Sequence, residues 1–320
     1  MNNLVMAGGV ALNCVANGRL RRESPFKSIW IQPAAGDAGA ALGAALHLWH
    51  HQLGNPRHPS PSDRQKGSLL GPSFHDEEIK ALLDSVGASY RYLPDEDGLL
   101  DRVVQLLDEE KVIGWFHGRM EYGPRALGSR SIIGDARSTR MQQVMNVKIK
   151  FRESFRPFAP CVLRELADAI FEMNPEEDSP YMMFVAPIRQ QWRKALDTDE
   201  QLRMKDPDLR VRVSVCRSEF PAITHVDYSA RIQTVDAARH GRFYRLMRRF
   251  FETTGCPVIV NTSFNIRGEP IVCSPEDAYR CFMATAMDCL VLENFLLLKD
   301  LQPADLAEDA DAYKTRYALD

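Results

Sequence analysis

The chain carries almost no net charge. It has 40 lysine and arginine residues and 43 aspartate and glutamate residues, which gives a formal net charge of −3 over 320 residues. This balance provides no global field that would draw the chain to nucleic acid or to an anionic membrane. Any site for an anion must therefore be local.

Long apolar runs and paired cysteines are also missing. No run approaches the ~18 to 20 residues that a membrane span needs, and the N-terminal residues lack a signal-peptide cleavage pattern. The seven cysteines lack the C-x-x-C spacing of a zinc site or a disulfide framework. We therefore expect a soluble, cytoplasmic protein with reduced, buried thiols.

What is present is an ordinary globular composition, with 45% apolar and 26% charged residues. At roughly 150 residues per domain, the length allows two domains. Apolar spacing predicts strands at 4–7 and 28–32 with a helix over 10–20 between them, followed by a helix that ends near residue 51. Residues 54–68 are rich in proline, serine and charge, which predicts a linker.

Beyond this linker, predicted helices alternate with predicted strands. The helices lie at 76–87, 99–107 and 275–287, and the strands at 112–116, 258–260 and 288–298. The last of these is either a strand pair or one long edge strand, and Ser274 is the expected N-cap of the helix before it. Such alternation indicates an α/β or α+β sheet domain. From Asp300 onward the chain carries six acidic and two basic side chains, which predicts a solvated acidic end.

Two short segments near the N-terminus are candidate ligand sites. Gly8 and Gly9 separate a predicted strand from a helix that includes Asn13, and free amide groups at a helix start favour anionic oxygen, so a nucleotide phosphate is one occupant and a simple tight turn is the alternative. Asp37 follows the second strand, where it can ligate a metal, orient a phosphate or cap the next helix. His47 has a helical partner four residues later, but about 15 Å of helix separates it from Asp37, so we interpret this pair as surface residues.

The strongest candidate for an anion site lies between residues 119 and 156, a segment that contains nine basic and three acidic residues. Arginine offers bidentate forks to phosphate oxygens and lysine a point charge, a mixture suited to two anionic substrates. Interleaved glycine and proline favour a shaped loop over a solvated basic face. The basic residues are Arg119, Arg125, Arg130, Arg137, Arg140, Lys148, Lys150, Arg152 and Arg156.

Polar residues later in the chain are further candidates. Thr262, Ser263 and Asn265 follow a predicted strand, where small hydroxyl and amide groups can wrap a phosphate or purine. His225, Asp227 and Arg231 lie close together and are either substrate contacts or parts of a satisfied polar turn. The arginines at helical spacing from Arg242 to Arg249 are expected to form a solvated helix face.

Taken together, several motifs resemble the NodU/CmcH-type carbamoyltransferase family from about residue 6 to about residue 298. They are G-G-V-A-L-N, G-D-A-G-A-A-L-G-A-A-L, G-R-M-E-Y-G-P-R-A-L-G-S-R-S-I, F-R-P-F-A-P, T-H-V-D and N-T-S-F-N-I-R-G-E-P. The resemblance implies an α/β protein in which a C-terminal fragment of an actin-like (ASKHA) domain precedes a YrdC-like domain with a twisted open sheet. The implied parts are residues 1–53 for the fragment, 54–68 for the linker, 69–305 for the YrdC-like domain and 306–320 for an acidic tail.

The resemblance also implies an O-carbamoyltransferase. Family members use ATP with Mg²⁺ and carbamoyl phosphate to make carbamoyl-adenylate, and then pass the carbamoyl group to a hydroxyl of a small metabolite. Lys150, Arg152, Ser263 and Asn265 are similar to the K-x-R and S-x-N elements by which YrdC-like domains hold ATP and the carbamoyl group.

These matches divide the candidate residues into four expected roles. The residues expected in catalysis are Arg119, Glu121, Arg125, Arg130, Lys150 and Arg152. Those expected to bind the nucleotide are Gly8, Gly9, Asn13, Arg156, Thr262, Ser263 and Asn265. His225, Asp227 and Arg231 are expected to bind substrate, and Asp37 is the expected metal ligand.

This sequence departs from the family pattern in its N-terminal part. Family proteins are longer, and they hold a divalent metal such as iron through an H-x-x-x-H pair plus aspartates; here only Asp37 matches. A metal with one protein ligand would bind weakly. The incomplete half-domain is expected to leave a sheet edge and apolar helix faces exposed, open to a partner chain that supplies the missing half.

Two other classes of function stay open at this point. One is a non-catalytic module that binds nucleotide or a partner subunit. The other is RNA binding through the basic segment. The near-neutral net charge and the lack of aromatic residues between the basic ones argue against it. The carbamoyltransferase interpretation requires the cations from Arg119 to Arg156 to converge on one concavity with the Ser263 and Asn265 turn.

Overall fold

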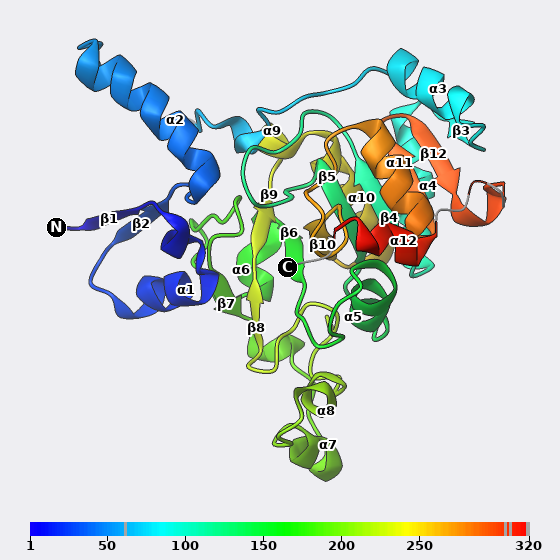
Figure 1. The fold of residues 1–320 in the computed structure, drawn as a ribbon. Helices are drawn as coiled ribbons and strands as arrows, with labels where there is room; N and C mark the ends of the chain where they lie inside the picture. The colour runs from blue at the N-terminus through cyan, green and yellow to red at the C-terminus, as the bar shows by residue number, and fades with distance from the viewer. Residues whose placement is uncertain (61–62, 304–305, 307–308, 318–320) are drawn as a thin grey trace.

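An eight-stranded mixed sheet forms the centre of the larger part of the molecule (Figure 1). The computed structural model describes residues 1–60, 63–303, 306 and 309–317. Neighbouring strands are antiparallel except for the β11–β4 and β6–β9 pairs, which are parallel. In order across the sheet, the strands are β3 (Arg91–Tyr92), β12 (Phe295–Leu298), β11 (Cys289–Leu292), β4 (Ile113–Phe116), β5 (Arg130–Asp135), β10 (Val258–Ser263), β6 (Ala159–Leu163) and β9 (Gln233–Val235).

The four longest helices of this part cover the sheet. Helix α10 packs on α4 and on strands β6 and β10, whereas α11 packs on α3 and on strands β4 and β11. Strands β4, β5, β6 and β11 are buried along their whole length, as expected for strands covered on both faces. These helices are α3 (Asp76–Ser85), α4 (Glu96–Asp108), α10 (Arg242–Thr254) and α11 (Pro275–Ala284).

Short elements complete this part of the molecule. A two-stranded antiparallel ribbon, β7 (Val185–Pro187) with β8 (Ser229–Arg231), lies beside the sheet. The short helices are η3 (Lys66–Ser68), α5 (Met141–Val144), η4 (Met145–Ile149), η5 (Arg164–Leu166), α6 (Ala167–Ile170), η6 (Gln190–Trp192), α7 (Thr198–Arg203), α8 (Leu209–Val213), α9 (Ala237–His240), η7 (Lys299–Leu301) and α12 (Ala310–Thr315).

A small N-terminal unit packs against the ribbon and leaves much apolar surface open. Its parallel strands flank a helix as expected, while α2 projects away from the rest of the chain and buries none of its own residues (Figure 1). Trp30, Trp49 and Val5 are each more than half exposed, so the expected open apolar faces are present. The elements are β1 (Asn3–Met6), η1 (Gly9–Leu12), α1 (Cys14–Glu23), β2 (Ser28–Ile31), α2 (Asp37–His47) and η2 (Leu48–Gln52).

The structure corrects two expectations about local structure. The helix expected over 10–20 begins only at Cys14, because the Asn13 side chain accepts the Ala16 backbone N–H at 3.1 Å and caps the helix there. The arginine face of α10 is not simply solvated. Arg245 pairs with Glu96 of α4, and the neighbouring arginines of that face find carboxylates on α4 or α10 or in the segment after β6.

The acidic tail is also anchored rather than merely solvated. Tyr313 of α12 is 1% exposed and donates its hydroxyl to Glu269. The part of the expected tail at 307–308 and 318–320 lies outside the described residues. Among the described residues, no helix combines the length and apolar character required to span a membrane.

All seven cysteines are free thiols, but not all of them are buried as expected. Cys161 and Cys281 are among the four buried thiols, whereas Cys273 is exposed. Cys14 is half-buried at the start of α1.

Candidate functional site

A cavity of about 450 Å³ opens where the N-terminal unit meets the sheet part. Its walls come from the start of α1, the loop before β5, the loop leading into β6, the turn before β8 and the end of β10. This volume falls within the usual range for small-molecule sites, roughly 300 to 1,000 Å³. The candidate residues that line it are Arg125, Arg152, Arg156, His225, Arg231, Thr262 and Ser263.

Two guanidinium groups face this cavity without an anionic partner. In the part of the chain that the structure describes, neither Arg125 nor Arg231 pairs with a carboxylate, and the Nε atom of each is buried without a hydrogen-bond partner. Among the described residues, Arg125 donates only to the Leu12 carbonyl, at 3.3 Å. Burial and the charge of Arg125 lower the pKa of Arg231 to about 10, and burial lowers the pKa of Arg125 as well. Because unpaired buried charge is costly, this arrangement favours an anionic ligand.

Arg152 and Arg156 add positive charge to the same cavity. Arg152 donates its Nε to Asn146 Oδ1 at 2.7 Å and lies over the Phe158 ring, with 5.0 Å between its guanidinium carbon and the ring centroid. Burial, followed by the charge of Arg156, lowers the pKa of Arg152 to about 10. Arg156 is half exposed and pairs with Glu153 at 3.2 Å, so it contributes a screened charge at the rim.

Lys150 lies directly behind the cavity wall. Its Nζ donates to Asn265 through the carbonyl and Oδ1, both at 2.9 Å, and it contacts the carbonyl of Ser263 and, at 3.4 Å, its Oγ. Burial and the charge of Arg152 lower the pKa of Lys150 to about 7, while the surrounding oxygen acceptors favour its ammonium form. Ser263 lines the cavity, whereas Lys150 and Asn265 lie outside its lining and contact the Oγ of Ser263.

The family signature around Arg119 mainly builds a loop. The carboxylate of Glu121 accepts the backbone N–H groups of Leu127 at 2.6 Å and Ser129 at 2.7 Å. Arg130 is fully buried, stacks on Phe116 and donates to backbone carbonyls. Arg119 is exposed, donates to the Leu70 carbonyl and lines a separate cavity of about 210 Å³.

The expected convergence of cations therefore does not extend to Arg119 and Arg130. Glu121 and Arg130 hold the loop that carries Arg125 toward the cavity. Farther along the segment, Arg137 pairs with Asp135 at 2.6 Å and Arg140 pairs with Glu110 at 2.7 Å, both away from the cavity. Backbone carbonyls and carboxylates thus satisfy four of the nine basic side chains of this segment away from the cavity.

The N-terminal candidates lie outside the cavity lining. Gly8 adopts a φ of 93° and donates its N–H to the Ala35 carbonyl at 2.8 Å, which links the segment after β1 to the segment before α2. Gly9 opens η1, and Asn13 caps α1. Asp37 is exposed in the first turn of α2, and no group of three His, Cys, Asp or Glu side chains suitable for a metal occurs among the described residues. These residues alone do not fit a metal centre.

His225 and Asp227 have different surroundings. His225 lines the cavity, and burial lowers its pKa to about 4, so its imidazole is neutral at pH 7. Asp227 is exposed; its carboxylate accepts the N–H of Ser229 at 3.0 Å and the Oγ at 2.7 Å. Asp227 therefore shapes the turn that presents His225, and it does not line the cavity.

Sequence reasoning missed the contribution of α1 to this cavity. Cys14 and Val15, the first residues of that helix, line it, and the Cys14 thiol interacts with Arg231. No local signal could have shown this, because α1 reaches the cavity through its packing against the β7 ribbon. Asn17 fixes this contact by donating to the Met183 carbonyl at 2.8 Å.

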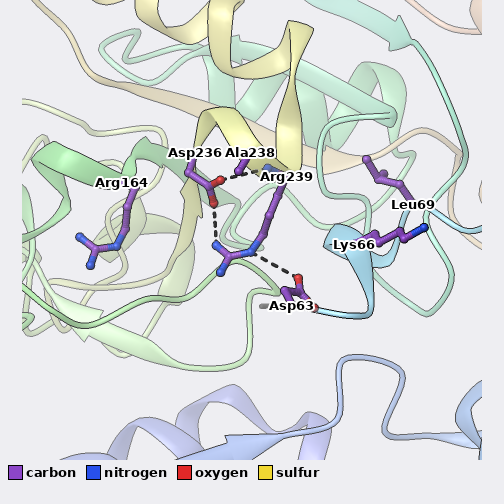
Figure 2. Close-up of a pocket in the computed structure, with 7 residues that line it drawn as sticks. All are labelled: Asp63, Lys66, Leu69, Arg164, Asp236, Ala238 and Arg239. Atoms are coloured by element: carbon purple, nitrogen blue, oxygen red, sulfur yellow. Dashed lines mark hydrogen bonds and ion pairs between the residues drawn. The ribbon is translucent and has the colours of Figure 1, made fainter. Parts of the chain in front are cut away.

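A larger cavity of about 570 Å³ differs in that its central guanidinium, Arg239, is paired with carboxylates (Figure 2). There, the Arg239 guanidinium is surrounded by Asp63 at 3.3 Å, Asp178 at 2.7 Å and Asp236 at 2.6 Å. These carboxylates neutralise Arg239 and fix the end of the expected linker, through Asp63, to the sheet part. This contrast favours the cavity around Arg125 as the candidate anion site.

Family comparison supports the resemblance found in the motifs. The family model described as Carbamoyltransferase C-terminus matches residues 104–299, which is more than half of the chain. The chain belongs to the carbamoyltransferase family. The model described as Carbamoyltransferase N-terminus matches residues 1–46.

Relatives of the family cover nearly all of this chain. It is 56% identical over 322 residues to an uncharacterized protein of Synechocystis sp., covering 100% of this chain and 51% of that protein. It is 37% identical over 301 residues to the nodulation protein NolNO of Sinorhizobium fredii, covering 93% of this chain and 40% of that protein. The chain thus spans about half the length of the curated relatives it matches.

Among solved structures, full-length HypF in its phosphate- and nucleotide-bound form matches 88% of this chain and 39% of its own chain. Its TM-score of 0.37 and identity of 15% leave this match without bearing on the fold.

Proposed function

We propose that this chain carries the activating half of an O-carbamoyltransferase, which binds ATP and carbamoyl phosphate in the cavity around Arg125 and Arg231 and makes carbamoyl-adenylate for a small-molecule hydroxyl acceptor. The observation that carries the proposal is the pair of half-buried guanidinium groups, each of which has a buried Nε without a hydrogen-bond partner and no carboxylate partner among the described residues. Family membership supports the carbamoyl chemistry. In this proposal residues 1–53 end an actin-like domain and residues 69–305 form a YrdC-like domain.

The proposed reaction needs only ATP, carbamoyl phosphate, the hydroxyl acceptor and water. Water releases phosphate from carbamoyl phosphate and leaves carbamate, whose oxygen attacks the α-phosphorus of ATP. The bond from that phosphorus to the bridging oxygen breaks, and pyrophosphate leaves. The acceptor hydroxyl oxygen later attacks the carbamoyl carbon, AMP departs, and the hydroxyl proton passes to solvent.

The side chains of the cavity suit the charge that develops in the first transfer. Arg125, Arg152 and Arg231 converge on the space where phosphate oxygens would lie, and preorganised cations in a water-poor site stabilise developing negative charge. Mg²⁺ bound to ATP would neutralise part of the triphosphate charge. Ser263 Oγ and the neutral imidazole of His225 supply hydrogen-bonding groups without adding charge.

Pyrophosphate release in the presence of ATP and carbamoyl phosphate tests this proposal. Arg125→Ala should lower the rate on the order of ten- to a thousand-fold, through the loss of one charge-assisted contact. Arg140→Ala is the matched control, because it removes the same charge from the same segment at an exposed position outside the cavity. Folded wild-type protein that releases no pyrophosphate, or equal losses in both variants, would refute the proposal.

A second proposed role concerns the open apolar faces of the N-terminal unit. Trp30 and Trp49 are both about half exposed, and α2 buries none of its residues. We infer that a polypeptide completing the actin-like domain covers these faces and supplies the metal-binding histidines that pair with Asp37. Trp30→Ser should abolish the complex with such a chain in size-exclusion chromatography and leave pyrophosphate release unchanged; a complex that persists would count against this role.

RNA binding finds less support. The basic segment does not form one exposed stripe, since Arg130 is buried and Arg137 and Arg140 pair with carboxylates.

A further inference from the structure

The C-terminal helix α12 packs against the back of the candidate site. Its central residue, Tyr313, is buried, and its hydroxyl donates to Glu269 Oε1. Burial raises the pKa of Tyr313, so the phenol keeps its proton and acts as a donor at neutral pH. The tail is thereby tied to the segment that follows the Ser263 and Asn265 turn.

Glu269 connects Tyr313 to the Ser263 and Asn265 turn through further hydrogen bonds. Its other carboxylate oxygen accepts the Ile266 N–H at 2.8 Å, and its backbone carbonyl accepts Asn265 Nδ2 at 2.6 Å. Asn265 Oδ1 in turn accepts from Ser263 Oγ at 2.7 Å and from Lys150 Nζ at 2.9 Å. A continuous chain of hydrogen bonds thus runs from α12 to the wall of the cavity.

Helix α12 also contacts the segment that contains Lys150 and Arg152. Lys314 Nζ lies 4.1 Å from the centroid of the Phe151 ring. Phe151 separates Lys150 from Arg152 and has a φ of 47°, a left-handed conformation that is uncommon for a residue other than glycine. Such a backbone conformation persists only where surrounding contacts enforce it. Helix α12 provides one of these contacts.

We propose that α12 is a brace that positions both Lys150 and the Ser263 and Asn265 turn for the activating reaction, with Tyr313 and Lys314 as positioning residues. This inference rests on the proposed function, because it assigns the tail a role in the same site. The acidic tail is in this view part of the active-site scaffold.

Tyr313→Phe in the full chain tests the brace, because it removes one hydroxyl and keeps the buried ring. Thr315→Ala is the control, since Thr315 is an exposed residue of the same helix and bonds only within it. Amide hydrogen exchange should become faster at 263–269 in Tyr313→Phe and stay unchanged in the control. Lys314→Ala should loosen 150–152 in the same way, which provides a second variant if the first unfolds.

Turnover then separates positioning from general destabilisation. Tyr313→Phe should lower kcat for pyrophosphate release about tenfold with a smaller change in KM for ATP, and this loss should shrink to about twofold or less in an Asn265→Ala background, because the two residues share one network. Unchanged exchange at 263–269, or an undiminished loss in the Asn265→Ala background, would overturn the brace. Wild-type protein without any turnover would refute the proposed function, and the exchange experiment would still decide the brace.

Discussion

Replacing Arg231 with methionine should make the protein more stable and also much less active. Arg231 is half-buried beside a second guanidinium, Arg125; its Nε is buried, and it finds no carboxylate in the described part of the chain. Methionine has a similar length and no charge, so Arg231→Met removes the repulsion while filling much of the same space. Replacement of buried charge by packed apolar side chains is often stabilising.

The size of this effect follows from the pKa of Arg231, which falls from an ordinary value of 12.5 to about 10 in the folded chain. One pKa unit corresponds to about 1.4 kcal/mol, so the folded state bears a penalty on the order of 3 kcal/mol for keeping this group charged. For a cation with a lowered pKa, the penalty is fully present below the folded value, hence at pH 7. After allowance for lost contacts, we expect the free energy of unfolding to rise by about 1 to 3 kcal/mol.

Two assays on one preparation check this prediction. Thermal or denaturant unfolding should show the gain in stability, and pyrophosphate release from ATP and carbamoyl phosphate should fall on the order of ten- to a thousand-fold. Arg140→Ala, at an exposed position, should change neither quantity appreciably. An Arg231→Met protein that is less stable than the wild type and keeps its activity would refute the reasoning about unpaired charge.

Three further predictions concern the scaffold around the site. Gly128→Ala should lower the free energy of unfolding by about 1 to 3 kcal/mol or more in denaturant titrations, because Gly128 has a φ of 113° and a Cβ there would lie 2.3 Å from Phe243. Glu96→Gln should lower the free energy of unfolding by about 1 to 2 kcal/mol at pH 7, because Arg245 holds the pKa of Glu96 at about 2. The stabilisation by the Glu96 carboxylate is present above pH 4.5 and is lost as the pH falls toward 2, so the variant and the wild type should be equally stable there. The wild type should lose stability as the pH falls from 6.5 to about 4, because the unfolded chain protonates His225 first, and His225→Gln should remove that part of the pH dependence.

Sequence patterns predicted the regular elements of the sheet part well. The helix at 76–87, the strand at 112–116 and the N-cap at Ser274 appear with boundaries shifted by at most a few residues. The pattern at 288–298 is a strand pair, β11 with β12. These elements were predictable because their buried apolar side chains recur at regular spacing, and this spacing can be read from the local sequence.

The site was predicted less completely, for physical reasons. Charge counting found the segment that supplies Arg125 and Arg152, but it could not tell which cations would be satisfied by backbone carbonyls, as Arg130 is. Nor could it show that α1 contributes Cys14, or that Tyr313 anchors the tail. Each of these outcomes depends on contacts between segments far apart in the chain.

Titration calorimetry of the wild-type chain with ATP, repeated on Arg231→Met, tests the central claim most directly. The claim is that the unpaired cations of the cavity bind an anionic substrate. It predicts one saturable site per wild-type chain, with affinity lost in Arg231→Met and kept in Arg140→Ala. Equal ATP affinity in all three proteins, or no binding to the wild type, would contradict it.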